Sequence, residues 1–270
     1  MADMRIGIVG CAGRMGRMLV GEVAAAEGCV IAGGTEAPGS AAIGKDVAAL
    51  AGLDPVGIAV GDDPEALFAA VDTVIDFTAP AASVHHAALA AAARCALVIG
   101  TTGLDADDDA KIAEAAADTA IVIAANTSVG VTLLTALVRQ VAGILGDDYD
   151  IEIVEMHHHH KVDAPSGTAL ALGRAAAAGR GVDFEATARL SREGRTGARP
   201  RGEIGFATLR GGDVVGEHEV IFAGPGERLV LGHIAGSRQL FARGALRATL
   251  WTRGQAPGLY SMADVLGLAD

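Results

Sequence analysis

The segment best suited to chemistry is an internal run of four histidines, residues 157–160, followed directly by Lys161. Histidine exchanges protons near neutral pH, and a neighbouring ammonium group adds a fixed positive charge or a second proton donor. Ser166, Gly167 and Thr168 follow, at the predicted start of an alanine-rich helix. Free N–H groups and hydroxyls at a helix N-terminus attract carboxylates. The segment therefore predicts a proton-transfer site for an anionic substrate.

A metal centre is the alternative explanation for these histidines. Successive side chains of a strand point to opposite faces, so at most two of the four imidazoles could meet at one ion. No cysteine lies near them, and Lys161 would repel a cation. We therefore predict proton transfer at this segment and no metal site.

A second candidate site is a glycine-rich turn near the start of the chain, between an apolar strand and a predicted helix. Gly10, Gly13 and Gly16 are spaced GxxGxxG, which differs from the usual GxGxxG. Glycines let the backbone approach a pyrophosphate, and the helix N-terminus presents free N–H groups to it. Glu36 lies 20 residues further on, at the end of the next predicted strand. A carboxylate there accepts hydrogen bonds from an adenosine ribose, so we predict a dinucleotide site.

The residues after Glu36 bear on the choice of dinucleotide. Ala37 and Pro38 follow, and no cation occurs before Lys45. A ribose 2′-phosphate would therefore meet a carboxylate without a compensating positive charge. We expect NADH to be preferred and NADPH to be used less well. Two loops of small and hydroxyl residues, 100–103 and 124–128, also follow predicted strands and suit the approach of a nicotinamide ring.

Short apolar runs alternate with alanine-rich stretches in the first half of the chain, which is typical of a parallel sheet covered by helices on both faces. Ser83 is predicted to cap the third of these helices. Strands are predicted at residues 5–9, 29–35, 73–77, 96–99 and 121–124, and helices at 13–27, from 64 onward, at 83–94 and at 107–118.

The pattern changes after about residue 150. A strand (151–156) and a helix (168–178) precede three strands in a row, at 204–210, 214–223 and 228–235, which we predict to form a meander. A last helix, 240–251, is expected to return to the first domain. The predicted fold class is α/β: a Rossmann-type parallel-sheet domain plus an α+β domain with a mixed, mainly antiparallel sheet. The expected boundaries are 1–126 with 241–270 for dinucleotide binding, and 127–240 for substrate binding and oligomerisation.

Composition excludes several classes of partner. The formal net charge is −12, which disfavours nucleic acid. Three scattered cysteines favour a reducing, cytoplasmic compartment over a disulfide framework. Residues 119–138 carry no charge and are long enough to span a bilayer, but their polar residues predict a strand, a turn and the start of a helix, so we expect no membrane contact. One face of the second sheet, carrying Phe206, Leu209 or their alternating neighbours, is left for another subunit, which predicts a homotetramer.

Several segments together resemble the 4-hydroxy-tetrahydrodipicolinate reductase family, also called dihydrodipicolinate reductase. The pattern HHxHKxDAPSGT at residues 157–168 is the most specific of them. The others are GCAGRMGR (10–17), VIDFT (74–78), VIGTTG (98–103), SREG (191–194), GFAT (205–208) and GEH (216–218).

The resemblance implies roles for individual residues, and a family that uses NADH or NADPH and usually forms tetramers. His157 resembles the catalytic proton donor and acceptor, and Lys161 a proton donor. The substrate, a small dicarboxylate, is expected to contact His158, Ser166, Gly167 and Thr168. The cofactor is expected to contact Gly10, Cys11, Ala12, Gly13, Arg14, Met15, Gly16, Glu36, Phe77, Gly100, Thr101, Thr102, Ala124, Ala125, Asn126 and Thr127.

Four residues depart from the family pattern. His159, Ala37 and Ala79 stand where the family carries arginine, and Thr127 replaces a phenylalanine. The loss of arginine at 37 and 79 weakens any site for a 2′-phosphate.

The implied activity is NAD(P)H-dependent reduction of 4-hydroxy-tetrahydrodipicolinate in lysine and diaminopimelate biosynthesis. Two alternatives remain at this point: another Rossmann-type reductase, such as an amino-acid semialdehyde dehydrogenase, and a non-enzymatic NADH-sensing module. The first needs a nucleophilic cysteine or a different Lys/Asp pair, and the second a partner surface or a basic DNA-binding element.

Overall fold

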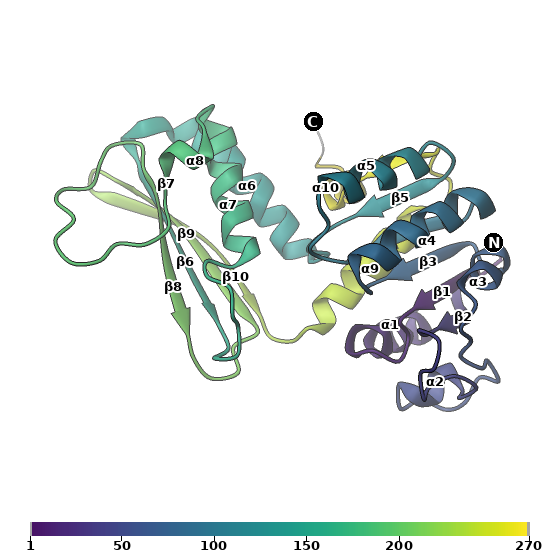
Figure 1. The fold of residues 1–270 in the computed structure, drawn as a ribbon. Helices are drawn as coiled ribbons and strands as arrows, with labels where there is room; N and C mark the ends of the chain where they lie inside the picture. Colours follow the sequence, from purple (N-terminus) through teal and green to yellow (C-terminus); the bar gives the residue numbers. More distant parts are fainter. Residues whose placement is uncertain (1, 269–270) are drawn as a thin grey trace. The chain divides into compact units, whose positions relative to one another are not determined.

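The computed structural model describes residues 2–268, which divide into two compact units. Unit 1 comprises the chain up to Ser128 together with the C-terminal segment from Gln239, and unit 2 is Val129–Arg238. Both units appear in Figure 1. The C-terminal segment thus returns to the first unit, as the sequence predicted.

Unit 1 is built on a six-stranded sheet in the order β11-β5-β4-β3-β1-β2, with every neighbouring pair parallel. The chain adds β2 on one side of β1 and then crosses to β3 on the other side, which makes β1/β3 the topological switch point. The strands are β1 (Met4–Val9), β2 (Cys29–Thr35), β3 (Thr73–Asp76), β4 (Ala96–Ile99), β5 (Ala120–Ile123) and β11 (Gly258–Tyr260).

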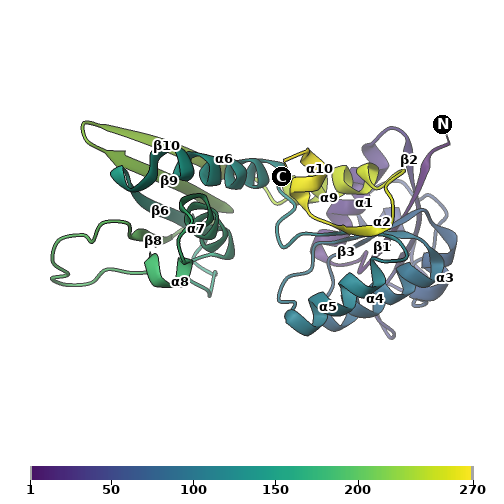
Figure 2. The same ribbon diagram turned by 90° about the horizontal axis from the view of Figure 1, so that it is seen from above.

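Helices cover both faces of this sheet, as Figure 2 shows. One face carries α1 (Arg14–Ala25), α9 (Gln239–Trp251) and α10 (Met262–Leu266). The other face carries α3 (Pro64–Ala70), α4 (Pro80–Ala93) and α5 (Ala106–Ala115), and α2 (Val47–Leu50) lies beside α1. Leu67, Phe68 and Ile112 pack with the strands in a buried apolar core, which accounts for the continuous apolar strand sequences.

Unit 2 has a five-stranded mixed sheet in the order β10-β9-β6-β8-β7. The helices α6 and α7 pack on each other, and both contribute to the apolar core that covers one face of the sheet. The elements are α6 (Val129–Leu145), a short 3-10 turn (Gly146–Asp148), β6 (Asp150–His157), α7 (Gly167–Arg180), α8 (Phe184–Thr187), β7 (Ala188–Arg189), β8 (Ile204–Arg210), β9 (Gly216–Gly224) and β10 (Glu227–Ala235).

The predicted meander is wrong. β9 and β10 do form a hairpin, but β6 lies between β8 and β9, parallel to the former and antiparallel to the latter. The connection after β8 therefore crosses the end of β6, where Gly211 N donates to His157 O and His158 N donates to Val214 O. The apolar inner face of β6, with Ile151 and Ile153 fully buried, explains its central place, because a strand with two neighbours buries more surface than an edge strand.

Three smaller expectations also need correction. Ser83 does not cap its helix, because α4 begins at Pro80 and the Ser83 hydroxyl is buried and donates to Thr101. Phe206 lies in the core under the helices, so the outer face of the second sheet carries Leu209 instead. The ends of several other elements differ from prediction by one to three residues, as the fraying of helix and strand ends leads one to expect.

The uncharged stretch 119–138 is divided between β5 and α6, as predicted. The segment Val129–Asp148 is nevertheless long and apolar enough to cross a membrane by length and composition alone. In the structure, Leu134, Val138 and Ala142 of α6 are buried in the core of unit 2. Leu133, Leu137 and Ile144 of the same helix are exposed, so the chain itself covers only one face of this apolar helix.

Candidate active site

The predicted cofactor residues of unit 1 follow the carboxyl ends of five parallel strands. Residues 10–16 follow β1, Glu36 follows β2 and Phe77 follows β3. Residues 100–102 follow β4, and 124–127 follow β5. Carboxyl ends of parallel strands lie at one edge of a sheet, where open α/β sheets bind their ligands. The fold therefore brings these segments to a single edge.

The turn after β1 has the backbone that a pyrophosphate cradle requires. Gly10 has φ +67°, a left-handed conformation that favours glycine, and its carbonyl oxygen accepts a hydrogen bond from Gly13 N. A Cβ atom at Gly16 would overlap the Gly10 carbonyl, so the first turn of α1 passes too close for any other residue. Cys11 is fully buried, and burial raises the pKa of its thiol to about 11, so it contributes backbone rather than reactivity.

The carboxylate of Glu36 lies against this turn. Its Oε1 accepts a hydrogen bond from Ala12 N at 2.7 Å, and its side chain is half-buried. Arg17 Nε donates to the carbonyl oxygen of the same Ala12 at 2.8 Å. The loop thus carries one anchored carboxylate and one anchored guanidinium, and the residues fit a dinucleotide pyrophosphate with a ribose beside Glu36.

The later loops differ in what they expose. Phe77 packs so closely on Gly100 that a Cβ there would overlap the ring. Thr101 is buried, whereas Thr102 and Ala125 are exposed. Thr127 is buried and its hydroxyl donates to Phe241 O in α9. The hydroxyl of Thr127, a residue that departs from the family pattern, therefore helps to hold the return helix.

The histidine segment of unit 2 begins on the last residue of β6. His157 Nδ1 lies 2.6 Å from Oε2 of Glu155, which is 1% exposed. A carboxylate only accepts hydrogen bonds, so Nδ1 carries the proton and Nε2 is left for the substrate. Burial opposes the ionisation of Glu155, but bonds from Arg210, His157 and Ser166 N outweigh it and hold the pKa of Glu155 below its usual range.

Arg210 fixes the other side of Glu155. Its guanidinium donates to both carboxylate oxygens, at 2.8 and 2.9 Å, and also to Asp163 O at 2.7 Å. The carboxylate is thus held in a bidentate pair, the strong form of this interaction. A Cβ atom at Gly216 would stand 3.0 Å from His157 Nε2, so glycine at this position leaves room beside the reactive nitrogen.

His218 stands beside His157, with ring centroids 5.1 Å apart in an edge-to-face arrangement. Burial, followed by the charge of His157, lowers the pKa of His218 to about 4, so this ring is neutral at physiological pH. Its Nε2 lies 2.8 Å from Ser166 Oγ. The same oxygen accepts a hydrogen bond from Ala169 N, and Ser166 thereby caps the N-terminus of α7. The Ser166 hydroxyl is therefore occupied within the protein, while Gly167 is exposed at the helix N-terminus.

The remaining basic side chains of the segment are also held in place. Lys161 Nζ donates to Asp163 Oδ1 at 2.7 Å, and its side chain is 20% exposed. Desolvation and the charge of Arg238 lower the pKa of His158, whose Nε2 lies 3.5 Å from the Arg238 guanidinium. His159 Nδ1 donates to Gly212 O in the loop that crosses β6. The departure at His159 therefore stabilises that loop.

Sequence reasoning missed Glu155, Arg210 and His218 as site residues. A signal existed for Glu155, because residues two apart on a strand share a face and His157 is two residues on. The other two come from β8 and β9. The register places Arg210 opposite His157 and His218 opposite Glu155.

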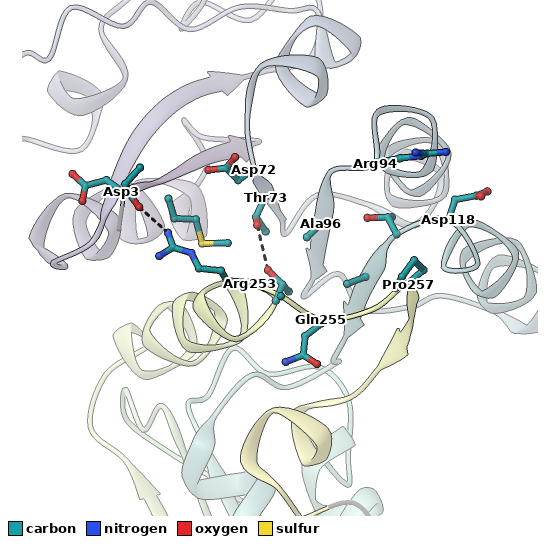
Figure 3. Close-up of a pocket in the computed structure, with 15 residues that line it drawn as sticks. Asp3, Asp72, Thr73, Arg94, Ala96, Asp118, Arg253, Gln255 and Pro257 are labelled. Carbon is teal, nitrogen blue, oxygen red and sulfur yellow. Dashed lines mark hydrogen bonds between the residues drawn. The ribbon is translucent and has the colours of Figure 1, made fainter.

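Two further observations concern regions outside the predicted site. No group of three histidine, cysteine or acidic residues within residues 2–268 is arranged to hold a metal ion. A cavity of about 560 Å³ (Figure 3) opens at the amino ends of the unit 1 strands, beside Met4, Thr73, Ala96 and Ala120. This is the sheet edge opposite the glycine-rich turn, and none of the predicted site residues lines the cavity.

A Rossmann-type unit with a glycine-rich turn that fits a dinucleotide, followed by a second unit that carries the histidine–lysine segment, is the architecture of a two-domain NAD(P)H-dependent oxidoreductase. Two family models match the chain: dihydrodipicolinate reductase, N-terminus, over residues 4–127, and dihydrodipicolinate reductase, C-terminus, over residues 130–266. The chain belongs to the dihydrodipicolinate reductase family.

Curated relatives agree along the whole length. The chain is 56% identical to 4-hydroxy-tetrahydrodipicolinate reductase of Ruegeria pomeroyi, covering 97% of each chain. It is 55% identical to the enzyme of the same name from Rhodopseudomonas palustris, covering 100% of both. Among solved structures, a dipicolinate-bound dihydrodipicolinate reductase from Paenisporosarcina sp. shares the fold, with a TM-score of 0.75 at 22% identity over 97% of this chain and 98% of that one.

Proposed function

We propose that this protein reduces 4-hydroxy-tetrahydrodipicolinate to tetrahydrodipicolinate with NAD(P)H, in lysine and diaminopimelate biosynthesis. The observation that carries the proposal is the His157–Glu155 pair, clamped by Arg210, beside Lys161 and the N-terminus of α7. These proton donors and positively charged groups suit the binding and protonation of a small dicarboxylate. When bound, the reduced dinucleotide supplies the hydride; the reaction takes up one proton, and the 4-hydroxyl group of the substrate leaves as water.

The chain's own residues perform the remaining steps. The positive end of α7, with the exposed Gly167, attracts a substrate carboxylate. Lys161, held by Asp163, offsets the negative charge that develops on the substrate ring and is one proton donor. His157 presents Nε2 for proton exchange because Glu155 fixes Nδ1. Neutral His218 packs against the His157 ring and limits its rotation.

The two alternative functions make different demands. A semialdehyde dehydrogenase needs a nucleophilic cysteine or a different Lys/Asp pair. All three cysteines are buried, and burial raises the thiol pKa of each, to about 11 for Cys11 and about 12 for Cys95, which disfavours the first of these. A sensing module would bind NADH without consuming it. An NADH oxidation assay with freshly prepared 4-hydroxy-tetrahydrodipicolinate separates the proposed reaction from both alternatives. Absence of turnover by folded protein that binds NADH would refute the proposed reaction.

Cofactor preference is the first testable consequence. We expect kcat/KM for NADH to exceed that for NADPH by about 5- to 150-fold, because a 2′-phosphate meets Glu36 beside the uncharged Ala37 and Ala79. Ala37→Arg should narrow this ratio by supplying a guanidinium. Arg17→Ala should widen the ratio. The guanidinium of Arg17 is held on the loop that also binds Glu36, where it can partly compensate the charge of a 2′-phosphate. Equal use of both cofactors by the unmodified protein would contradict the prediction.

Assembly is the second consequence, and we infer a homotetramer formed through unit 2, in the cytoplasm. The outer sheet face exposes Leu209, Val230 and Ile234, which are 50%, 50% and 72% exposed. Apolar groups gathered on one sheet face are characteristic of a subunit interface. Light scattering should give about four times the 27.1 kDa chain mass. A Val230→Asp, Ile234→Asp double variant should dissociate it, because burying two carboxylates is costly.

The matched control for the assembly experiment is Ile144→Asp. Ile144 is equally apolar and 74% exposed, but it lies on α6 rather than on the outer sheet face. This variant should remain tetrameric. A monomeric wild-type protein at micromolar concentration, or dissociation by Ile144→Asp alone, would contradict the assignment of the interface to the sheet.

A further inference from the structure

A buried polar network at the end of β3 is not used by the chemistry described above. Asp76, the last residue of β3, has no exposed surface. Its Oδ1 accepts hydrogen bonds from Thr78 N at 2.8 Å and from Thr78 Oγ1 at 2.6 Å, and Thr101 Oγ1 lies at 3.4 Å. The Oδ2 atom is 2.8 Å from His86 Nδ1. One carboxylate thus contacts three separate segments of the chain.

Two of those segments, the loops after β3 and β4, belong to the predicted dinucleotide site. Thr78 follows Phe77 after β3, and Thr101 lies in the loop after β4. Thr101 Oγ1 also accepts Thr78 N at 3.1 Å and the Ser83 hydroxyl at 2.7 Å. The methyl group of Thr78 lies 3.0 Å from the position that a Cβ on Gly10 would occupy, so it rests on the glycine-rich turn. Three cofactor loops therefore meet at Thr78.

His86 is the cationic or donor partner of this carboxylate. It projects from α4, its side chain is 9% exposed, and its ring stacks on Phe68 with centroids 5.9 Å apart. Burial opposes the ionisation of Asp76, but the bonds from His86 and Thr78 outweigh it and hold the pKa of Asp76 below its usual range. A buried carboxylate that lost one partner would carry an uncompensated charge, so removing His86 should disturb the whole network.

We propose that Asp76 and His86 are positioning residues for dinucleotide binding, which together fix the loops at Thr78 and Thr101 against the glycine-rich turn. The proposal rests on the proposed use of NAD(P)H. Neither side chain needs to contact the cofactor, because the effect is transmitted through the backbone and hydroxyl of Thr78 and the hydroxyl of Thr101. The pair thereby reduces the ordering that the loops must undergo when the dinucleotide binds.

The test compares His86→Ala with a matched control and a conservative variant. His85→Ala is the control, because His85 is the adjacent histidine of the same helix and is exposed. The readouts are NADH affinity by fluorescence titration without substrate, thermal stability, and kcat and KM for each substrate. His86→Ala should weaken NADH binding roughly 10- to 100-fold, the range for loss of a hydrogen bond to a charged group. His85→Ala should leave it unchanged.

Two measurements distinguish a positioning role from a general loss of stability: the recovery of NADH affinity in a conservative variant, and whether KM or kcat changes in His86→Ala. In His86→Asn the side-chain amide keeps a donor near the Nδ1 position, so NADH affinity should return to within about 3-fold of wild type. In His86→Ala the KM for NADH should rise, while kcat at saturating NADH and the KM for the dicarboxylate stay close to wild type.

Other outcomes would refute the positioning role, the proposed reaction, or both. If His86→Ala lowers the melting temperature but leaves NADH affinity unchanged, or if His86→Asn fails to restore affinity while restoring stability, the positioning role is refuted. If wild-type protein binds NADH but does not reduce the dicarboxylate, the proposed reaction fails while this inference stands. If wild-type protein binds neither dinucleotide, both are overturned.

Discussion

Replacement of Lys161 by alanine should lower kcat by about 10²- to 10⁴-fold, the usual contribution of a positioned proton donor. The variant removes the ammonium group that Asp163 holds at 2.7 Å, and with it the positive charge that we propose offsets the developing anion. NADH affinity should stay near wild type, because Lys161 belongs to unit 2 and the dinucleotide cradle to unit 1. Steady-state kinetics and an NADH titration check the two expectations separately.

Lys111→Ala is the matched control for this experiment. Lys111 also forms an ion pair with an aspartate, Asp107, at 2.6 Å, but it lies on an exposed helix face of unit 1. An exposed pair of this kind contributes little to stability, so the control should keep full activity. A Lys161→Ala enzyme with wild-type kcat would show that Lys161 is not a proton donor and would leave His157 as the only candidate.

The fold of unit 1 could be predicted from sequence because its signals are local. The strand 96–99 is apolar along its whole length, the strand 29–35 contains only apolar and small residues before Thr35, and the structure has both with the predicted bounds. The prediction that Ser83 caps a helix is wrong because of a tertiary contact. The helix begins at Pro80, which is favoured in the first turn, and the serine hydroxyl is used by Thr101 from another loop.

The strand order of unit 2 could not be predicted, because it depends on contacts distant in the chain. The turns at 211–213 and 224–226 look alike in sequence, yet only the second joins neighbouring strands. Inserting β6 beside β8 and β9 buries Ile151 and Ile153 among the helices, and no local pattern encodes that choice.

The same error explains which site residues were missed. His157 and Lys161 stand out by residue type alone. Arg210 and His218 reach His157 only because β8 and β9 flank β6, so a predicted meander separates them from the histidine segment. Thr127 shows the opposite case: its position after β5 favours a cofactor contact, but its hydroxyl is taken by Phe241 O. Side-chain partners at this level follow from sheet order and register.

The structure makes Glu155 the residue on which His157 depends, and Glu155→Gln should lower kcat by about 10²- to 10³-fold. An amide offers one acceptor and one donor in place of two acceptors. It therefore cannot satisfy His157 Nδ1, Ser166 N and both guanidinium nitrogens of Arg210 together. The imidazole loses its fixed tautomer and orientation. NADH affinity should not change, and the KM for the dicarboxylate should change much less than kcat.

Glu152→Gln controls for the loss of an arginine-bound carboxylate on the same strand. Glu152 lies three residues earlier on the opposite face of β6 and is bound by Arg192 through both oxygens at 2.8 Å, with no histidine beside it. The Glu152→Gln variant should lower the melting temperature by about as much as Glu155→Gln does, while its kcat stays near that of the wild type. Equal losses of kcat in the two variants would mean that Glu155 acts through stability alone.

A double-mutant cycle shows whether Glu155 works through His157. If it does, Glu155→Gln should cost little further activity in a His157→Ala background, because the group it orients is already absent. If it acts independently, its loss in kcat should multiply with that of His157→Ala. The bidentate clamp from Arg210 and the 2.6 Å contact to Nδ1 favour the first result, because they tie the Glu155 carboxylate directly to the His157 ring. A fully multiplicative cycle would remove Glu155 from the proton-transfer centre and assign it to the packing of β6.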